Sequence, residues 1–124
     1  MNLIIGAGAV GTVLAGYFVK ARQPMQFLVK PEELSSFKGL QHLQVTRIHG
    51  GAPLQVPCPK VTTRLNLDGV LRVFVCVKTP ALAGLLQQFP ETLPANVELF
   101  PCVNGPGIGR LFRERFPGTP VTPV

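Results

Sequence analysis

The sequence contains no tryptophan, a single tyrosine and few charged residues, which make up 15% of its 124 positions. It also lacks an apolar run of the roughly 20 residues that a transmembrane helix requires, so we expect no membrane partner. Its hydrophobic content of 46% is instead typical of a globular chain with a buried core. The length suits one domain spanning residues 1–124. Because strand-like residues begin at Asn2, we expect no signal peptide and a cytoplasmic location.

Cysteine is scarce and forms no metal-binding or disulfide pattern. The three cysteines, Cys58, Cys76 and Cys102, are odd in number and contain no CxxC pair. His42 and His49 do not lie at a metal-ligand spacing from them. We therefore predict reduced thiols that behave as small hydrophobic side chains, and no metal site.

Acidic residues are few, with 6 Asp and Glu against 12 Lys and Arg and a net charge of +6. A basic balance can indicate nucleic-acid binding, but the basic residues are scattered and no aromatic residues alternate with them for base stacking. The one group, Arg110, Arg113 and Arg115, falls beside Glu114 on a predicted helix, where a solvated face explains it. We expect no nucleic-acid partner, whereas a ligand with several phosphates suits the charge.

The first 30 residues predict a strand–helix–strand unit. An apolar strand at residues 2–5 ends in a glycine-rich turn, and a helix over residues 9–21 is broken at Gln23-Pro24 before a second strand at residues 25–29. Six apolar residues at helical spacing are predicted to form the buried stripe of this helix: Val10, Val13, Leu14, Tyr17, Phe18 and Ala21.

The rest of the chain continues this alternation after an insertion. The insertion is a short helix at residues 31–37, then a hairpin with arms at residues 42–48 and 53–56 and a turn at Gly50-Gly51. Residues 66–71 allow no assignment. The later predicted elements are a buried strand at residues 73–77, a helix with Thr79 as N-cap and Pro80 in its first turn, a strand at residues 97–102, a helix over residues 108–116 and a last strand at residues 119–124.

Strands that alternate with helices predict an α/β fold of the Rossmann type, a doubly wound and mainly parallel sheet in a single domain. In such sheets ligands bind outside the carboxyl ends of the strands. The glycine turn, Lys78 and Asn104 each follow a predicted strand. We therefore expect them to meet at one edge of the sheet.

The glycine turn matches the GxGxxG pattern of dinucleotide-binding proteins, in the required position between a strand and a helix. Gly6 would permit the tight turn, Gly8 would let the pyrophosphate approach the backbone, and Gly11 would let the helix pack closely. The helix N-terminus would face the phosphates; a turn without a ligand is the alternative. The predicted cofactor-binding residues of this segment are Gly6, Ala7, Gly8, Ala9, Val10 and Gly11.

Lys30 follows the second strand, where NAD-binding proteins usually place an acidic residue on the ribose hydroxyls. An ammonium group there would attract a 2′-phosphate, so the sequence favours NADPH (NADP+) over NADH. Two alternatives stay open. Glu32 or Glu33 could take the acidic role, although Pro31 turns the chain first, or Lys30 is an ordinary solvated lysine.

Lys78 and Asn104 can each also be explained without a ligand. A lysine at the end of a buried strand can extend to solvent, and Asn104-Gly105 can simply form a turn.

Three segments together resemble the cofactor domain of the ketopantoate reductase (2-dehydropantoate 2-reductase) family: the glycine turn, Val75-Cys76-Val77-Lys78 and Asn104-Gly105-Pro106-Gly107. The resemblance covers essentially the whole chain. It implies an oxidoreductase that uses NADPH to reduce a 2-oxo acid to a 2-hydroxy acid, a step of pantothenate biosynthesis in the namesake enzyme. It also implies that Val77 and Lys78 lie beside the cofactor, that Asn104 holds nicotinamide or substrate, and that Lys30 binds the 2′-phosphate.

The sequence departs from the family in two places. An aromatic residue and a glutamine that commonly follow the strand-end lysine are replaced within Thr79-Pro80-Ala81, and Val103 stands where glutamine or histidine is common. These changes remove polar contacts at the nicotinamide end, so the substrate stays open. In the family a second, helical domain supplies the catalytic lysine, and we expect no catalytic residue within residues 1–124. A non-catalytic nucleotide-sensing module is the alternative, and homodimerisation through the face that the second domain would cover is a further expectation.

Overall fold

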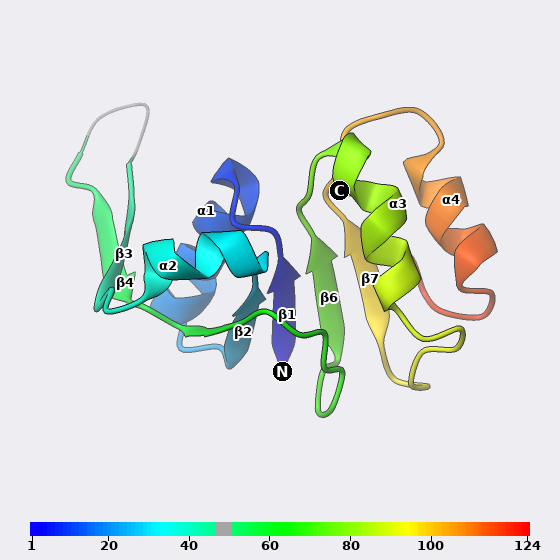
Figure 1. Cartoon of the computed structure of the whole chain (residues 1–124), viewed down its shortest axis with the longest axis horizontal. Coiled ribbons are helices and arrows are strands. Elements are labelled where there is room, and N and C mark those ends of the chain that lie inside the picture. The colour runs from blue at the N-terminus through cyan, green and yellow to red at the C-terminus, as the bar shows by residue number, and fades with distance from the viewer. Residues whose placement is uncertain (47–50) are drawn as a thin grey trace.

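The computed structural model describes residues 1–46 and 51–124 and has the predicted architecture (Figure 1). A five-stranded sheet has the order β5-β2-β1-β6-β7, and all of its pairings are parallel. The strands are β1 (Asn2–Ile5), β2 (Met25–Leu28), β3 (His42–Val45), β4 (Leu54–Pro57), β5 (Lys60–Thr62), β6 (Arg72–Val75) and β7 (Glu98–Pro101). The helices are α1 (Ala9–Lys20), the 3-10 turn η1 (Pro31–Glu33), α2 (Leu34–Phe37), α3 (Thr79–Gln88) and α4 (Ile108–Arg115).

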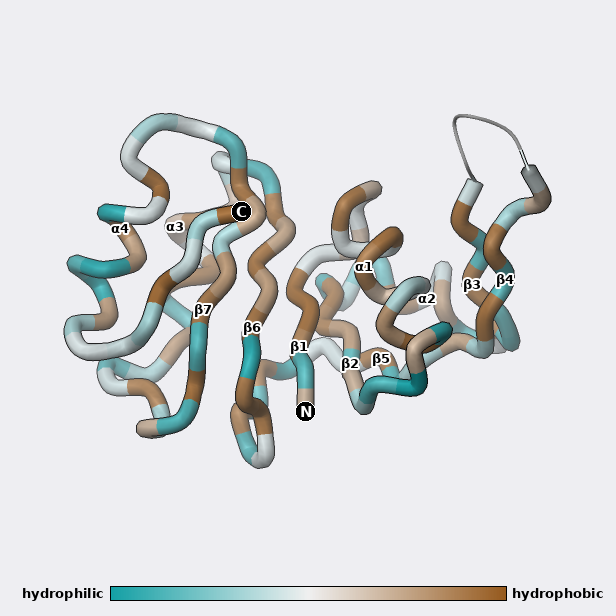
Figure 2. Tube along the Cα trace, turned by 180° about the vertical axis from the view of Figure 1, so that it is seen from behind, coloured by the Kyte–Doolittle hydropathy of each residue, from teal (hydrophilic) through white to brown (hydrophobic). Residues whose placement is uncertain are grey.

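The sheet is covered on both faces, which is why its central strand is apolar at every position but one. Along β1, Leu3 and Ile5 face the core under α3 and α4, where Phe112 and Phe116 are fully buried. Ile4, between them, faces the opposite core under α1. Side chains alternate between the faces of a strand, so a strand covered on both sides reads as an uninterrupted apolar run. Figure 2 shows this run as the brown stretch of β1.

The predicted hairpin is present as β3 and β4, a separate antiparallel pair that packs on α1. Its buried residues alternate with exposed ones, and Val45 pairs with Leu54. A Cβ on Gly16 of α1 would lie 2.8 Å from the Cγ2 atom of Val45, so this close packing needs glycine. Gly50, in the predicted turn, lies outside the described residues, as do positions 47–49.

The predicted apolar stripe of α1 is wrong at four positions, one of which is Ala21, exposed at the C-cap of the helix. Val10, Val13 and Tyr17 are 54%, 40% and 46% exposed, whereas the buried residues of the helix are Gly11, Ala15 and Gly16. The fully buried positions hold small residues because the helix lies close to the sheet and the hairpin, while Leu14, Phe18 and Val19 pack partly buried against the same core.

The predicted N-cap of α3 is also wrong. The helix begins at Thr79 itself, and Lys78 occupies the N-cap position without a side-chain cap. The Thr79 hydroxyl is used elsewhere, since Oγ1 donates a hydrogen bond of 3.2 Å to the backbone oxygen of Asn104. The side chain thus joins two loops instead of capping its own helix.

The predicted last strand at residues 119–124 is reduced to a single bridge between Leu99 and Val121, parallel to β7. The backbone N–H of Leu99 donates to the oxygen of Pro120 and that of Thr122 donates to the oxygen of Leu99, both at 2.9 Å. Pro120 and Pro123 have no N–H to continue a ladder. The segment therefore follows the sheet edge without forming a full strand.

The structure contains one strand that the sequence did not predict. β5 pairs parallel with β2 at the sheet edge, where Val61 lies opposite Phe27. It is short and partly exposed, so it lacks the apolar run that identifies a buried strand. Among the described helices, none is long and apolar enough to cross a bilayer.

Candidate functional site

The carboxyl ends of β1, β2, β6 and β7 form one edge of the sheet, and the loops that follow them gather there (Figure 1). From β1 the chain crosses to β2 on one side, while β6 lies on its other side and leads on to β7. The connections therefore reverse direction between β1 and β6. In open parallel sheets this reversal opens a crevice, and it is where ligands bind.

Two glycines of the turn after β1 are required by the fold itself. Gly6 has φ +109°, a region that favours glycine, and a Cβ there would collide with the backbone oxygen of Cys76. A Cβ on Gly11 would collide with the backbone oxygen of Gly6. Both positions must stay free of a side chain so that α1 can start directly above the β1–β6 pair.

Gly8 differs from both, because nothing in the protein requires it to be glycine. Its φ of −72° and ψ of −171° are extended values that any residue adopts. A Cβ on Gly8 would have no heavy atom within 4 Å. It stands at the N-cap of α1, where the first backbone N–H groups of a helix have no partner within it. The open space beside free N–H groups is a cradle that fits an anionic group such as a pyrophosphate.

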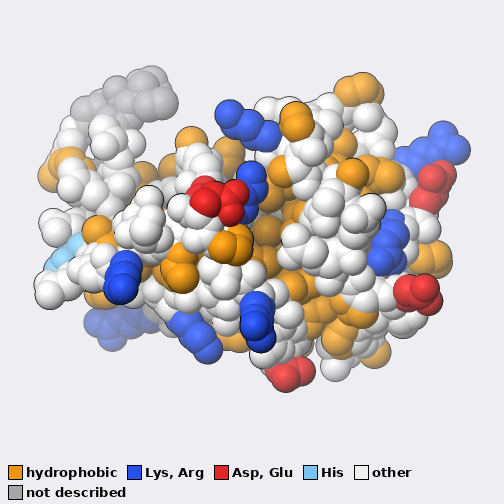
Figure 3. Space-filling model, viewed as in Figure 1, with side chains coloured by type: hydrophobic (Ala, Val, Ile, Leu, Met, Phe, Trp, Pro, Cys, Tyr) orange, Lys and Arg blue, Asp and Glu red, His pale blue; other side chains and the backbone are white. Residues whose placement is uncertain are grey.

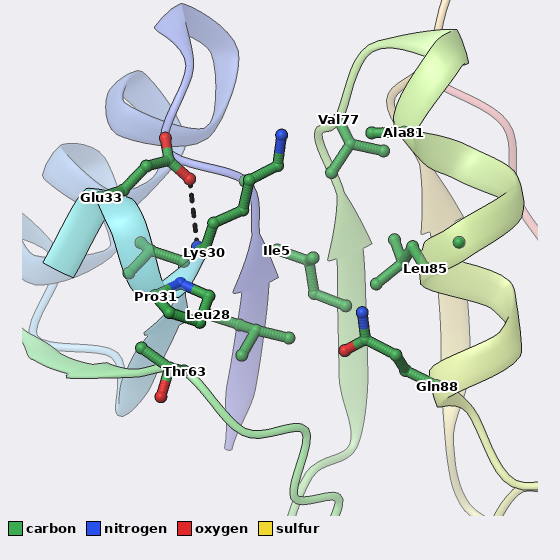
Figure 4. Close-up of a pocket in the computed structure, with 13 residues that line it drawn as sticks. Ile5, Leu28, Lys30, Pro31, Glu33, Thr63, Val77, Ala81, Leu85 and Gln88 are labelled. Atoms are coloured by element: carbon green, nitrogen blue, oxygen red, sulfur yellow. Dashed lines mark hydrogen bonds between the residues drawn. The ribbon is translucent and has the colours of Figure 1, made fainter.

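A first cavity of about 330 Å³ lies between the end of β2 and helix α3 (Figure 4). Ile5, Leu28 and Leu85 make its apolar wall, and Lys30 and Gln88 stand at opposite sides of it. Its remaining lining residues are Gly6, Val29, Pro31, Glu33, Thr63, Val77, Ala81 and Gly84. A largely apolar cavity with a few polar groups suits a flat heterocycle joined to a polar sugar.

Glu33 reaches this cavity, although Pro31 does turn the chain. Its Oε1 accepts a hydrogen bond of 3.0 Å from the backbone N–H of Lys30, and the short η1 turn brings the two residues together (Figure 4). The exposed Lys30 side chain leads away from this bond, past the end of β1. The cavity therefore carries a cation and a carboxylate at the same end.

A second cavity of about 450 Å³ lies on the other side of the glycine turn. Lys78 and Asn104, both exposed, contribute its polar side chains together with Thr79. The other residues that line it are Gly8, Ala9, Val10, Cys76, Val77, Pro80, Cys102 and Val103. Val77 lines both cavities, so the two adjoin at the switch point.

Eight of the ten predicted cofactor-binding residues line one or both of these cavities. The first contains Gly6, Lys30 and Val77, and the second contains Gly8, Ala9, Val10, Val77, Lys78 and Asn104. Ala7 and Gly11 line neither: Ala7 packs against the core under α1, and Gly11 is buried in α1.

Sequence reasoning missed Thr63 and Gln88 and placed Glu33 only among the alternatives. The spacing of Glu33 from Lys30, which is that of a capping box, was the available signal for the hydrogen bond that draws it in. No local sequence signal pointed to Thr63 or Gln88, because each reaches the site from a segment that is distant in sequence.

The basic side chains do not form a continuous surface around this site. On the face that Figure 3 shows, Lys and Arg are separated by neutral and apolar groups, and apolar side chains line the hollow at its centre. Within residues 1–46 and 51–124, no cluster of three His, Cys, Asp or Glu side chains could hold a metal ion.

Comparisons with known proteins show the family and the fold. The chain matches the model of the family described as "Ketopantoate reductase PanE/ApbA" over residues 2–123. A ketopantoate reductase of that family from Ralstonia eutropha JMP134 superposes with a TM-score of 0.77 at 19% identity, covering 99% of this chain and 40% of its own. A probable 2-dehydropantoate 2-reductase, panE, from Bacillus subtilis gives 0.75 at 18% identity, with coverage of 99% and 40%.

A D-mandelate dehydrogenase solved with NADH and anilino(oxo)acetate is similar to the same degree. It gives a TM-score of 0.77 at 17% identity, again covering 99% of this chain and 40% of its own. The chain thus spans about 40% of the length of these solved relatives. No curated protein sequence matches it.

Proposed function

The chain belongs to the ketopantoate reductase PanE/ApbA family, and on that basis we propose that it is the dinucleotide-binding domain, residues 1–124, of an NADPH-dependent 2-oxo-acid reductase. The observation that carries the proposal is Gly8. It leaves an open cradle at the N-terminus of α1 within the second cavity, and the first cavity adjoins it across the glycine turn. A ligand that crosses the glycine turn uses both cavities.

We assign a part of the dinucleotide to the cradle and to each cavity. The backbone from Gly8 to Val10 would hold the pyrophosphate, the first cavity the adenosine and the second the nicotinamide. When bound, the reduced nicotinamide supplies the hydride that a 2-oxo acid accepts at its carbonyl carbon. The mostly apolar wall of the second cavity, including Pro80 and Val103, would exclude water from the nicotinamide end.

Lys30 would select NADPH because its ammonium can pair with a 2′-phosphate at the adenosine end. Glu33 works against this preference. Its carboxylate is held nearby by the N–H of Lys30, where it would repel the phosphate and could accept hydrogen bonds from the ribose hydroxyls of NADH. Lysine also binds phosphate as a point charge and not through a bidentate fork. We therefore propose a modest preference for NADPH.

Lys78 and Asn104 would orient the nicotinamide or the substrate from the two loops that enclose the second cavity. The bond from Thr79 Oγ1 to the oxygen of Asn104 ties these loops together. It would keep Asn104 at a constant position beside Lys78. We assign no catalytic residue within residues 1–124.

A second candidate is a nucleotide-sensing module without chemistry. The apolar lining at Pro80 and Val103 favours it, because a substrate carboxylate would find few polar partners there. The coding sequence downstream separates the two candidates. A following helical domain with an inward lysine supports the reductase, whereas a stop codon supports the sensor.

Calorimetric titration with NADPH and with NADH tests the proposal. We expect tighter binding of NADPH, and we expect Lys30→Glu to reverse the preference because it places a carboxylate where the 2′-phosphate would lie. Lys38→Glu, on an exposed lysine that lines neither cavity, is the matched control for the change in net charge.

Two negative results of this experiment would lead to different conclusions. If neither dinucleotide binds at millimolar concentration, the proposed function is wrong. If both bind but Lys30→Glu leaves their ratio as in the wild type, only the role of Lys30 is wrong.

A further inference from the structure

Two of the three cysteines lie opposite each other at the carboxyl edge of the sheet. Phe74 of β6 and Phe100 of β7 are paired in register, and their rings stack with centroids 4.8 Å apart. Two residues further on, side chains return to the same face of each strand. Cys76 and Cys102 stand at these positions, and both contact the core under α1.

The backbone pairing continues as far as the cysteines. The N–H of Cys76 donates to the oxygen of Ile5 at 2.7 Å, and the N–H of Cys102 donates to the oxygen of Val75 at 2.8 Å. Neighbouring strands lie about 4.8 Å apart, within the range of about 4.4–6.8 Å that a disulfide spans between Cα atoms. The strand pairing therefore places the two Cα atoms within the range that a disulfide spans.

The two thiols differ in the way that a reactive pair requires. Both line the second cavity, but Cys76 is only 8% exposed, whereas Cys102 is partly exposed. The interaction with the Cys76 thiol lowers the pKa of Cys102, while the interaction with Cys102 and burial raise the pKa of Cys76. The Sγ of Cys102 donates a hydrogen bond of 3.5 Å to the backbone oxygen of Phe100. The lowered pKa thus belongs to the more exposed thiol, and the thiolate is the form that attacks an oxidant.

We propose that Cys76 and Cys102 are a redox modification site that closes to a reversible intramolecular disulfide when the chain meets a peroxide. The Cys102 thiolate attacks one peroxide oxygen, the O–O bond breaks, and the protonated leaving oxygen departs as water. Cys102 is then a sulfenic acid. The Cys76 sulfur attacks the Cys102 sulfur, the S–O bond breaks, and a second water leaves. Two thiols are oxidised and one peroxide is reduced to two waters.

This site shares the second cavity with Gly8, Ala9 and Lys78. If the proposed function holds, a bound dinucleotide covers Cys102 and shields it from peroxide. Oxidation would in turn link the ends of β6 and β7 beside that cavity. The backbone oxygen of Cys76 lies close to Gly6 of the glycine turn. The redox state of the pair and dinucleotide binding would then oppose each other.

The test is a peptide map of the full chain after one equivalent of hydrogen peroxide, with free thiols then blocked by N-ethylmaleimide. We expect a Cys76–Cys102 cross-link, with Cys58 labelled, and we expect dithiothreitol to restore labelling of all three. Cys58 is the internal comparison: it is partly buried in a separate hollow, and burial raises its pKa. Cys58→Ala should leave the cross-link unchanged, and Cys102→Ser should remove it.

The wild-type map decides the question even if a variant folds poorly. Recovery of Cys102 as sulfinic acid beside a labelled Cys76, or cross-links that form first through Cys58 of two chains, would overturn the proposal. Repeating the oxidation with NADP+ at ten times its Kd leaves about a tenth of the chains free, so cross-linking should slow about tenfold. Cross-linking that NADP+ does not slow would contradict the proposed position of the dinucleotide and leave the disulfide standing.

Discussion

The three motif glycines of the turn are glycine for different physical reasons. Gly6 and Gly11 avoid collisions with backbone oxygens of the protein, whereas Gly8 has open space beside it. A motif match treats the three as equivalent. The structure separates a requirement of the fold from a requirement that only a ligand can impose.

This difference predicts opposite phenotypes for two alanine substitutions. Gly11→Ala should lower the free energy of unfolding by about 2 kcal/mol or more, because backbone must move to admit the methyl group. Gly8→Ala should change it by less than about 1 kcal/mol, since a poorer N-cap is offset by a less flexible unfolded chain. The Gly8 variant should nevertheless lose dinucleotide binding. Urea denaturation and calorimetry measure both effects, and a destabilised Gly8→Ala protein would contradict this reading.

At the scale of elements, Arg115 of α4 is hydrogen-bonded to the backbone at the end of α3. The guanidinium of Arg115 donates to the backbone oxygens of Leu86, Phe89, Pro90 and Glu91 at 3.2–3.4 Å. Leu86 lies in the last turn of α3, and the other three residues follow the helix. The arginine thus adds hydrogen bonds at a helix end, where some carbonyls have no partner within the helix. The same group stands 4.5 Å from the ring centroid of Phe116. The predicted solvated arginine face is therefore wrong for Arg115, although Arg110 does form an exposed ion pair of 2.8 Å with Glu114.

Arg115→Ala should therefore destabilise the fold by about 1.5–3 kcal/mol, the value of hydrogen bonds from a charged group. Arg113→Ala removes an exposed arginine from the same helix and is the control. Chemical denaturation of the two variants gives the comparison. Equal stabilities would show that the Arg115 bonds contribute nothing net.

At the scale of the whole molecule, the candidate site spans both halves of the sheet. The first cavity begins at β2, the second ends beside β7, and β1 with β6 lies between them. α3 borders both cavities, and α1 begins between them. A ligand bound along this edge would connect elements that otherwise meet only through the sheet.

A ligand that binds only the folded chain must stabilise it. NADPH at 100 times its Kd should add about 2.7 kcal/mol to the free energy of unfolding, seen as a higher Tm. Gly8→Ala should abolish the increase while keeping the Tm of the unliganded chain near that of the wild type. An equal increase in both proteins would show that NADPH does not bind at the glycine turn.

The sequence by itself determined the α/β alternation, the glycine turn and the hairpin arms, because each depends on local patterns of spacing. A run of buried residues, a helical period and a turn glycine are all readable within a short window. The same patterns placed Lys30, Lys78 and Asn104 after their strands, and so at one edge of a parallel sheet.

Only the tertiary structure decided which neighbours these elements have. β5 is a polar edge strand that exists through its pairing with β2, and α1 buries Gly11, Ala15 and Gly16 while Val10, Val13 and Tyr17 are exposed. The cavity position of Glu33, the bond from Thr79 to Asn104 and the facing thiols of Cys76 and Cys102 likewise depend on contacts between separate elements. Periodicity identifies an element and its faces, whereas packing determines what each face meets.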